Sequence, residues 1–265
     1  MYLADCHVHS RMSPDGAVSM TELAEQAVRS GLDEVCFTDH VEPERVCGGT
    51  TDWAALRAEF EAARRSAGDR VRLRLGMELG EAPWDLPAAD RLVREGAELD
   101  LILGSNHCLP PEQGGGNLFT CAPADDEAAY RAIGLYLTQV KALAEWGRFT
   151  VLGHLTVPLR YFARRGLTHL TFDPYEAEVR DILTRLIHNG CGLELNTNQG
   201  GVPEPDMKWL RLYRELGGEL ITLGSDTHRP HTLGAGIREG QALLRACGFT
   251  RFCTFDRQRP VWHPL

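Results

Sequence analysis

The chain begins MYLADCHVHS, which places two histidines, His7 and His9, one residue apart. In an extended strand alternate side chains point to the same face, so both imidazoles would project side by side. Neutral imidazole is a common ligand of transition metals. A pair of surface histidines would give the same pattern, so this motif alone leaves a metal site and a plain surface pair as alternatives.

The composition is that of an ordinary globular protein, with 265 residues of which 43% are hydrophobic and 25% charged. No apolar run approaches the length of a membrane span, so we expect no membrane partner. The net charge of −9, without a long basic run, argues against a nucleic-acid partner. The eight cysteines form no Cys-x-x-Cys pair and no secretory leader is recognisable. We therefore expect a single cytoplasmic domain over residues 1–265.

Short apolar runs alternate along the chain with longer stretches of helical period. This alternation predicts an α/β fold with a parallel sheet and helices outside it, and seven such units predict a distorted, TIM-like (β/α)7 barrel. The tail, 251–265, predicts a strand or hairpin that closes the sheet edge. The predicted strands are 2–6, 34–38, 72–78, 99–105, 150–154, 192–196 and 220–225. The predicted helices are 19–31, 51–68, 126–147, 173–190, 203–218 and 236–248.

Six of the ten histidines lie at or just after the carboxyl ends of the predicted strands. In a barrel of parallel strands these ends converge on one face, where barrel enzymes build their active sites. Glu78, Glu194 and Asp226 lie at the same ends. This convergence favours a site for several metal ions over isolated surface histidines. The six histidines are His7, His9, His40, His107, His154 and His228.

The order of these residues resembles that of the polymerase and histidinol phosphatase (PHP) superfamily. The matching motifs are Asp5-x-His7-x-His9-Ser10, Thr38-Asp39-His40, Gly76-Met77-Glu78, Gly104-Ser105-x-His107, Gly153-His154-Leu155 and Gly224-Ser225-Asp226-x-His228. Within the superfamily, GHLTVPLRYF, LELNTNQG and ELGGELITLGSDTHRP are similar to segments of histidinol-phosphate phosphatases. The resemblance implies a metal-dependent phosphomonoesterase of histidine biosynthesis that converts L-histidinol phosphate to L-histidinol and phosphate.

The resemblance also implies three divalent transition-metal ions, and nitrogen and oxygen ligands without sulfur admit Zn, Mn, Fe or Co. The implied ligands are His7, His9, Glu78 and Asp226 for the first ion; Glu78, His107 and His154 for the second; and Asp15, His40 and His228 for the third. Glu78 would bridge two ions. Glu78, Asp226 and His228 are the expected catalytic residues, acting around a metal-bridging hydroxide. Asp15, in SPDG, could equally belong to a plain turn.

Further residues are candidates for contacts with the substrate. Arg160 could clamp phosphate through a bidentate guanidinium or could be a solvated loop arginine, and Arg229 is a second candidate cation. Glu42 could meet the cationic groups of histidinol phosphate, and His231 could face the substrate. The long loop over 108–123 could act as a lid.

Other functions remain open on the sequence alone. A PHP-family phosphoesterase of different specificity would carry the same ligands. An amidohydrolase-type metal hydrolase also opens with His-x-His and has a late aspartate, but it normally has a lysine where this chain has Glu78. A metal-binding domain without activity would ordinarily lack some ligands, and none is missing here. A small-molecule phosphomonoester is therefore the expected partner.

Overall fold

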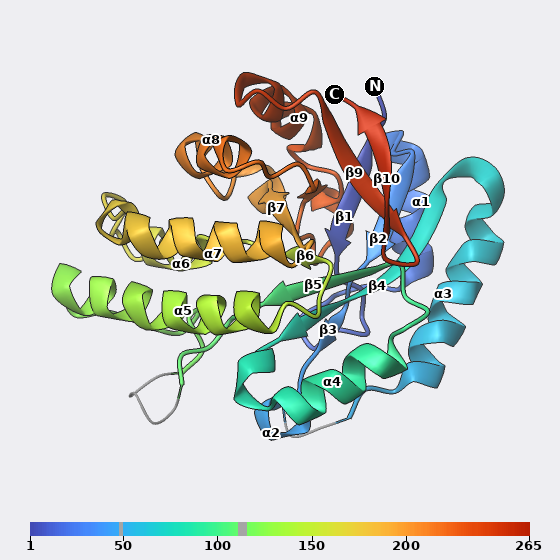
Figure 1. The fold of residues 1–265 in the computed structure, drawn as a ribbon. Coiled ribbons are helices and arrows are strands. Elements are labelled where there is room, and N and C mark those ends of the chain that lie inside the picture. The colour runs from blue at the N-terminus through green and yellow to red at the C-terminus, as the bar shows by residue number, and fades with distance from the viewer. Residues whose placement is uncertain (48–49, 111–115) are drawn as a thin grey trace.

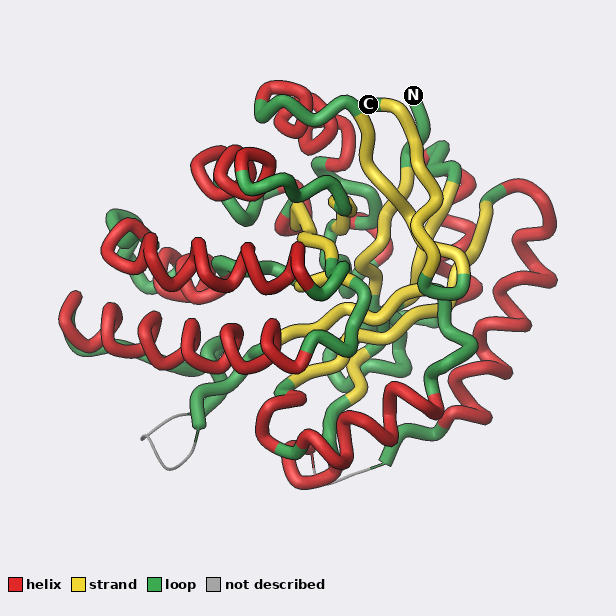
Figure 2. The backbone as a smooth tube through the Cα atoms, in the orientation of Figure 1, coloured by secondary structure: helices red, strands yellow, loops and turns green. Residues whose placement is uncertain are grey.

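Parallel strands form a nearly closed barrel inside a layer of helices (Figure 1) in the computed structural model, which describes residues 1–47, 50–110 and 116–265. Figure 2 shows the strands gathered at the centre with helices around them. The strand order is β1-β2-β4-β5-β6-β7-β8, and the two-residue β3 pairs with β4. The predicted distorted (β/α)7 barrel is therefore confirmed.

The barrel strands are β1 (Ala4–Val8), β2 (Glu34–Phe37), β3 (His40–Val41), β4 (Arg72–Gly80), β5 (Leu101–Ser105), β6 (Val151–Leu152), β7 (Gly192–Asn196) and β8 (Ile221–Gly224). The α-helices are α1 (Met20–Ser30), α2 (Glu44–Cys47), α3 (Trp53–Ala67), α4 (Leu86–Glu95), α5 (Asp126–Trp146), α6 (Val157–Ala163), α7 (Glu176–His188), α8 (Met207–Glu215) and α9 (Ile237–Ala246). Local sequence sets many of their ends. At the start of α1, Ser19 and Glu22 form a reciprocal capping box.

The barrel closes through hydrogen bonds between β1 and the segment that follows β8. The amide of Asp226 donates to the carbonyl of His7 at 2.9 Å, and the amide of His9 donates to the carbonyl of Thr227 at 2.8 Å. Val8 pairs with Thr227 in the parallel sense. This joint lies at the carboxyl ends of the strands, so barrel closure and placement of the ligand-type residues depend on the same contacts.

Several element boundaries differ from the sequence prediction. Strand β1 starts two residues late and includes His7, because its pairing with β2 begins at Ala4. Strand β6 has only two residues, since the chain leaves the extended conformation at His154, whose φ is 21°. Helices α4 and α6 were not predicted. Both have a proline in the first turn, and α6 has only seven residues.

The predicted hairpin in the tail is confirmed, but it does not close the edge of the barrel sheet. Strands β9 (Arg251–Asp256) and β10 (Arg259–Pro264) form a separate antiparallel pair. The ring of His263 stacks on Tyr2 with centroids 3.9 Å apart, which anchors the hairpin beside the start of β1. The prediction that the tail closes the sheet edge is wrong, because β1 already pairs with the segment after β8.

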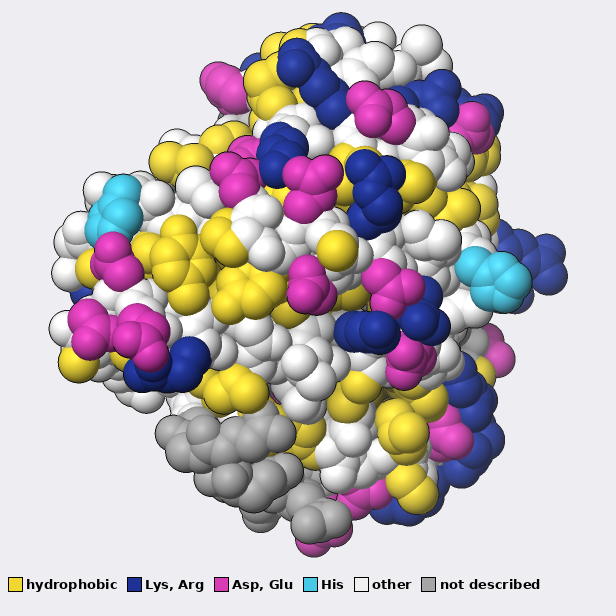
Figure 3. Space-filling model, turned by 60° about the vertical axis from the view of Figure 1, so that its left-hand side comes forward, with side chains coloured by type: hydrophobic (Ala, Val, Ile, Leu, Met, Phe, Trp, Pro, Cys, Tyr) yellow, Lys and Arg dark blue, Asp and Glu magenta, His cyan; other side chains and the backbone are white. Residues whose placement is uncertain are grey.

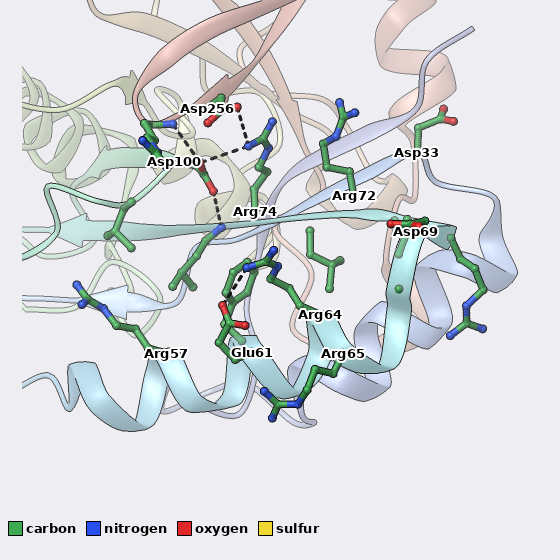
Figure 4. A pocket seen from close by; sticks show the side chains of 18 of the residues that line it. Asp33, Arg57, Glu61, Arg64, Arg65, Asp69, Arg72, Arg74, Asp100 and Asp256 are labelled. Carbon is green, nitrogen blue, oxygen red and sulfur yellow. Dashed lines mark hydrogen bonds and ion pairs between the residues drawn. The ribbon is translucent and has the colours of Figure 1, made fainter.

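A cleft of about 1180 Å³ opens between α3, the start of β4 and the β9–β10 turn (Figure 4). Seven arginines and six carboxylates line it, so their charges nearly balance. Arg74, for example, lies 3.1 Å from Asp256 and 3.5 Å from Asp100. The cleft lies at the amino-terminal end of β4, whereas the ligand-type residues lie at the carboxyl ends of the strands.

The surface carries charges of both signs. On the face drawn in Figure 3, Lys and Arg side chains are interspersed with Asp and Glu. Within the described ranges, no helix combines the length and the apolar character that a membrane crossing requires. The histidines and carboxylates that could bind metal ions lie together at the carboxyl ends of the barrel strands.

Candidate metal centre

The carboxyl ends of the strands bring all nine predicted metal ligands together. They form four groups, together with Glu42, in which the potential ligand atoms lie within 4.8 Å of one another. Two groups are His7, His9 and Asp226, and His7, Glu78 and His154. The other two are His9, Asp15, His40 and His228, and His40, Glu42 and His107. Shared members join the groups into one continuous centre.

Glu78, near the end of β4, occupies the middle of this centre and turns its two oxygens toward different histidines. Its Oε1 lies 2.8 Å from Nε2 of His154 and 3.2 Å from Nε2 of His107. Its Oε2 lies 3.4 Å from Nε2 of both His7 and His9, and 3.2 Å from Nδ1 of His40. One carboxylate thus faces two pairs of imidazoles, as a ligand that bridges two ions would.

The imidazoles of each pair face one another through ring nitrogens. The Nε2 atoms of His7 and His9 lie 3.0 Å apart, and those of His107 and His154 lie 3.2 Å apart. Two unprotonated nitrogens repel at this distance unless a proton or another cation lies between them. Because transition-metal ions favour imidazole and carboxylate ligands, the residues present fit such ions.

Asp15, His40 and His228 form the outer part of the centre. Oδ2 of Asp15 lies 3.1 Å from Nε2 of His228 and 3.7 Å from Nε2 of His40. The SPDG turn is present, with the amide of Gly16 donating to the carbonyl of Ser13 at 3.1 Å. The turn therefore does not compete with a ligand role, because it aims Asp15 at the imidazoles.

The buried carboxylates and imidazoles of the centre shift one another's pKa values. Burial disfavours protonation of the imidazoles, but the facing carboxylates raise the pKa of four of them: His7, His40, His107 and His228. Burial opposes ionisation of Glu78, but the facing imidazoles, His107 above all, hold its pKa well below the ordinary value. The pKa of Asp226 is also far below its ordinary value, because neighbouring cationic groups outweigh burial. Burial lowers the pKa of His9 to about 3. Ionised carboxylates and a neutral imidazole are the forms that coordinate metal ions.

Two buried glutamates behind the ligands were not assigned to the site from the sequence. Glu194 accepts a hydrogen bond from Nδ1 of His7 at 2.7 Å, which leaves Nε2 of that ring facing the centre. Glu81 accepts hydrogen bonds from the amides of His107 and Cys108. Carboxylates placed behind ligands fix their orientation. The position of Glu194 at a strand end was a signal, whereas nothing in the sequence marked Glu81.

Two other buried acids from the sequence motifs form hydrogen bonds between neighbouring segments of the barrel instead of facing the metal-ligand groups. Asp5 accepts hydrogen bonds from the amide and hydroxyl of Ser225 at 2.8 and 2.5 Å. Asp39 accepts them from the amide of Ser10 and the hydroxyl of Ser13, both at 2.7 Å. Asp5 thereby ties β1 to the end of β8, and Asp39 ties the loop after β1 to the end of β2.

Arg160 points from α6 into the centre and is only 8% exposed. It donates from Nε to Glu204 Oε1 at 3.0 Å, from Nη2 to Asn196 Oδ1 at 2.9 Å and from Nη1 to Asp226 Oδ2 at 2.5 Å. The alternative of a solvated loop arginine is therefore wrong, because the unpredicted helix turns this side chain inward. A contact between Arg160 and phosphate stays a prediction.

The other predicted substrate residues lie within a few residues of predicted metal ligands along the chain. Arg229 and His231 are exposed on the segment after β8. Glu42 is half-buried, with Oε1 3.5 Å from Nδ1 of His40. Their contacts with the substrate stay predictions. The predicted lid includes residues 111–115, which lie outside the described residues.

The fold and the site define a barrel with a multinuclear set of metal ligands at the carboxyl ends of its strands. Residues 5–198 match the family model of the PHP domain, and the chain belongs to this family. It is 28% identical over 254 residues to a probable histidinol-phosphatase of Thermotoga maritima, with 93% of each chain covered. It is 25% identical over 270 residues to the histidinol-phosphatase of Lactococcus lactis, with 95% of this chain and 94% of that protein covered.

A solved structure shares the fold. The crystal structure of histidinol phosphate phosphatase from Lactococcus lactis, complexed with Zn, L-histidinol and phosphate, matches with a TM-score of 0.75. The match covers 98% of both chains at 20% sequence identity, so it supports a shared fold and nothing further. The predicted resemblance to the PHP superfamily and to its histidinol-phosphatases is thus confirmed.

Proposed function

We propose that the chain is a metal-dependent phosphomonoesterase that hydrolyses L-histidinol phosphate to L-histidinol and phosphate. The observation that carries the proposal is Glu78, which presents one oxygen to each of two histidine pairs. Metal ions that share a carboxylate are suited to phosphate esters, because together they can stabilise the attacking and leaving oxygens. The choice of substrate is supported by the similarity to histidinol-phosphatases over almost the whole chain.

The nine ligands would hold three divalent ions of zinc, manganese or iron. Three carboxylates contribute −3 and three ions would contribute +6, so the centre would carry about +3 inside an acidic protein. Such a charge favours a dianionic phosphate over a neutral amide. When bound, the ions would polarise the phosphoryl oxygens and activate water for attack on phosphorus.

The chain's own groups organise this chemistry. Glu194 holds the ring of His7 and Glu81 holds the backbone at His107, so the ligands need little rearrangement. Arg160 keeps a fixed positive charge beside Asp226, where negative charge on a phosphoryl group would grow in the transition state. We assign Glu78, Asp226 and His228 to the catalytic centre and the contact with phosphate to Arg160.

The proposal is tested by phosphate release from a panel of phosphomonoesters, with elemental analysis of the same sample. We expect about three transition-metal ions per chain and the highest kcat/KM on histidinol phosphate. Protein that holds at most one ion after reloading would contradict the trinuclear site. Equal rates on unrelated phosphomonoesters would favour a PHP phosphoesterase of other specificity, and turnover of cyclic amides alone would favour an amidohydrolase.

The replacement Glu42→Gln is expected to affect cationic substrates selectively. If Glu42 meets the ammonium or imidazolium group of histidinol phosphate, its loss removes a charge-assisted hydrogen bond. That loss corresponds to about 1.5 kcal/mol, or roughly a tenfold rise in KM. Hydrolysis of p-nitrophenyl phosphate, which has no cationic group, serves as the control and should keep its KM. Equal losses on both substrates would show that Glu42 acts through the neighbouring His40 instead.

A further inference from the structure

Glu204 lies beside the metal-ligand groups but contacts them through an arginine. It is 5% exposed, and both oxygens of its carboxylate contact the guanidinium of Arg160. Oε1 lies 3.0 Å from Nε and Oε2 lies 3.4 Å from Nη2. A two-point contact of this kind fixes the plane of the guanidinium as well as its position.

The other edge of the same guanidinium meets a predicted metal ligand. Nη1 of Arg160 donates to Oδ2 of Asp226 at 2.5 Å. The second oxygen, Oδ1, lies 3.5 Å from Nε2 of His9 and 3.7 Å from Nε2 of His7. The two oxygens of Asp226 therefore have different partners. Oδ2 accepts a hydrogen bond from Arg160, and Oδ1 faces the imidazoles of His7 and His9.

The loop over 197–206, which carries Glu204, holds Asp226 a second time through its backbone. Nε2 of Gln199 donates to the carbonyl of Asp226 at 3.0 Å, and the amide of Gln199 donates to the carbonyl of Ser225 at 2.9 Å. Asp226 has a φ of 58°, a left-handed conformation that residues other than glycine seldom adopt. The surrounding contacts must therefore maintain it.

We propose that Glu204 is a positioning residue that sets how Asp226 binds its metal ion; this inference rests on the proposed metal-dependent function. The carboxylate of Glu204 balances the charge of Arg160, so Asp226 is not the sole counter-ion of a buried guanidinium. Without that charge, Arg160 would draw Asp226 toward itself and compete with the ion for the carboxylate. Residues behind metal ligands typically change metal affinity by about 10–100-fold when replaced.

The test compares Glu204→Gln with wild type during zinc loading against a chelator, with ions counted by elemental analysis. We expect one ion per chain to bind about 10–100-fold more weakly, while the others keep their affinity. On histidinol phosphate, kcat should fall more than KM changes. Glu204→Asp keeps the charge but shortens the side chain, and we expect its zinc affinity to lie between those of wild type and the glutamine variant.

Glu34→Gln is the matched control. Glu34 is also buried and lies near arginines, 3.6 Å from both Arg72 and Arg74, but at the amino-terminal end of the barrel. We expect this control to lower the melting temperature of the metal-free protein without changing zinc affinity. Wild-type zinc affinity in both Glu204 variants would overturn the positioning role, and so would a wild type that binds no ion. Wild-type protein that binds its ions but hydrolyses no phosphomonoester would overturn the proposed function. In that case the zinc affinities of the Glu204 variants would still test the positioning role.

Discussion

Replacing Glu78 by glutamine is expected to abolish turnover and release metal while the barrel still folds. Each carboxylate oxygen faces a different histidine pair, so an amide, with one oxygen and one NH₂ group, can serve only one of them. The loss of a bridging ligand removes several kcal/mol of transition-state stabilisation, so kcat should fall by about a thousandfold or more. The measurement is steady-state kinetics on histidinol phosphate together with metal content.

Thermal unfolding of the metal-free proteins separates this effect from misfolding. Glutamine has nearly the same shape as glutamate, so the metal-free variant should unfold cooperatively, as the metal-free wild type does. Wild-type protein should gain much more stability from added zinc than the variant, because ligands that bind the native state stabilise it. Near-normal kcat with a full complement of ions would remove Glu78 from the centre.

Arg160→Ala is expected to lower kcat/KM by a factor on the order of 10²–10³ on every phosphomonoester, as does the loss of one oxyanion donor. The reason is that the guanidinium holds Asp226 and supplies positive charge beside it. The substitution also leaves Glu204 as a buried carboxylate without its cation, and breaking such a pair costs about 3–5 kcal/mol of stability. Kinetics on histidinol phosphate and p-nitrophenyl phosphate, with thermal unfolding, measure both effects.

Arg160→Lys should recover only part of the activity, because an ammonium group cannot meet three acceptors with the planar fork of arginine. Arg74→Ala is the matched control, since Arg74 pairs with Asp100 and Asp256 far from the metal centre. It should reduce stability and leave kcat/KM unchanged. If Arg160→Ala lost stability alone, as this control is expected to do, the arginine would have no role in phosphate chemistry.

Much of the site follows from the sequence because parallel strands impose a simple rule. Side chains at the carboxyl ends of successive parallel strands meet on one face of a barrel, so residues as distant as His7 and Asp226 are expected together once the strands are recognised. The strand pattern is local and periodic, which makes the barrel and the convergence of its strand-end histidines and acids predictable. The full set of nine ligands, with Asp15 in its loop, was instead implied by the resemblance to the PHP superfamily. Whether residues 1–265 form a single domain stays a prediction.

Only the tertiary structure decided what lies behind the ligands. Glu204, on an irregular loop, meets Arg160 on a short helix that begins with Val-Pro, and neither position has a periodic signal. Likewise, Glu81 reaches the backbone at His107 because its own backbone adopts a left-handed conformation at φ 47°. Such contacts depend on where loops cross after the barrel has closed. The strands can be recognised from local sequence periodicity, and parallel strands in a barrel must bring their carboxyl ends together. The residues that orient the ligands depend instead on packing between segments far apart in the chain, which local sequence does not reveal.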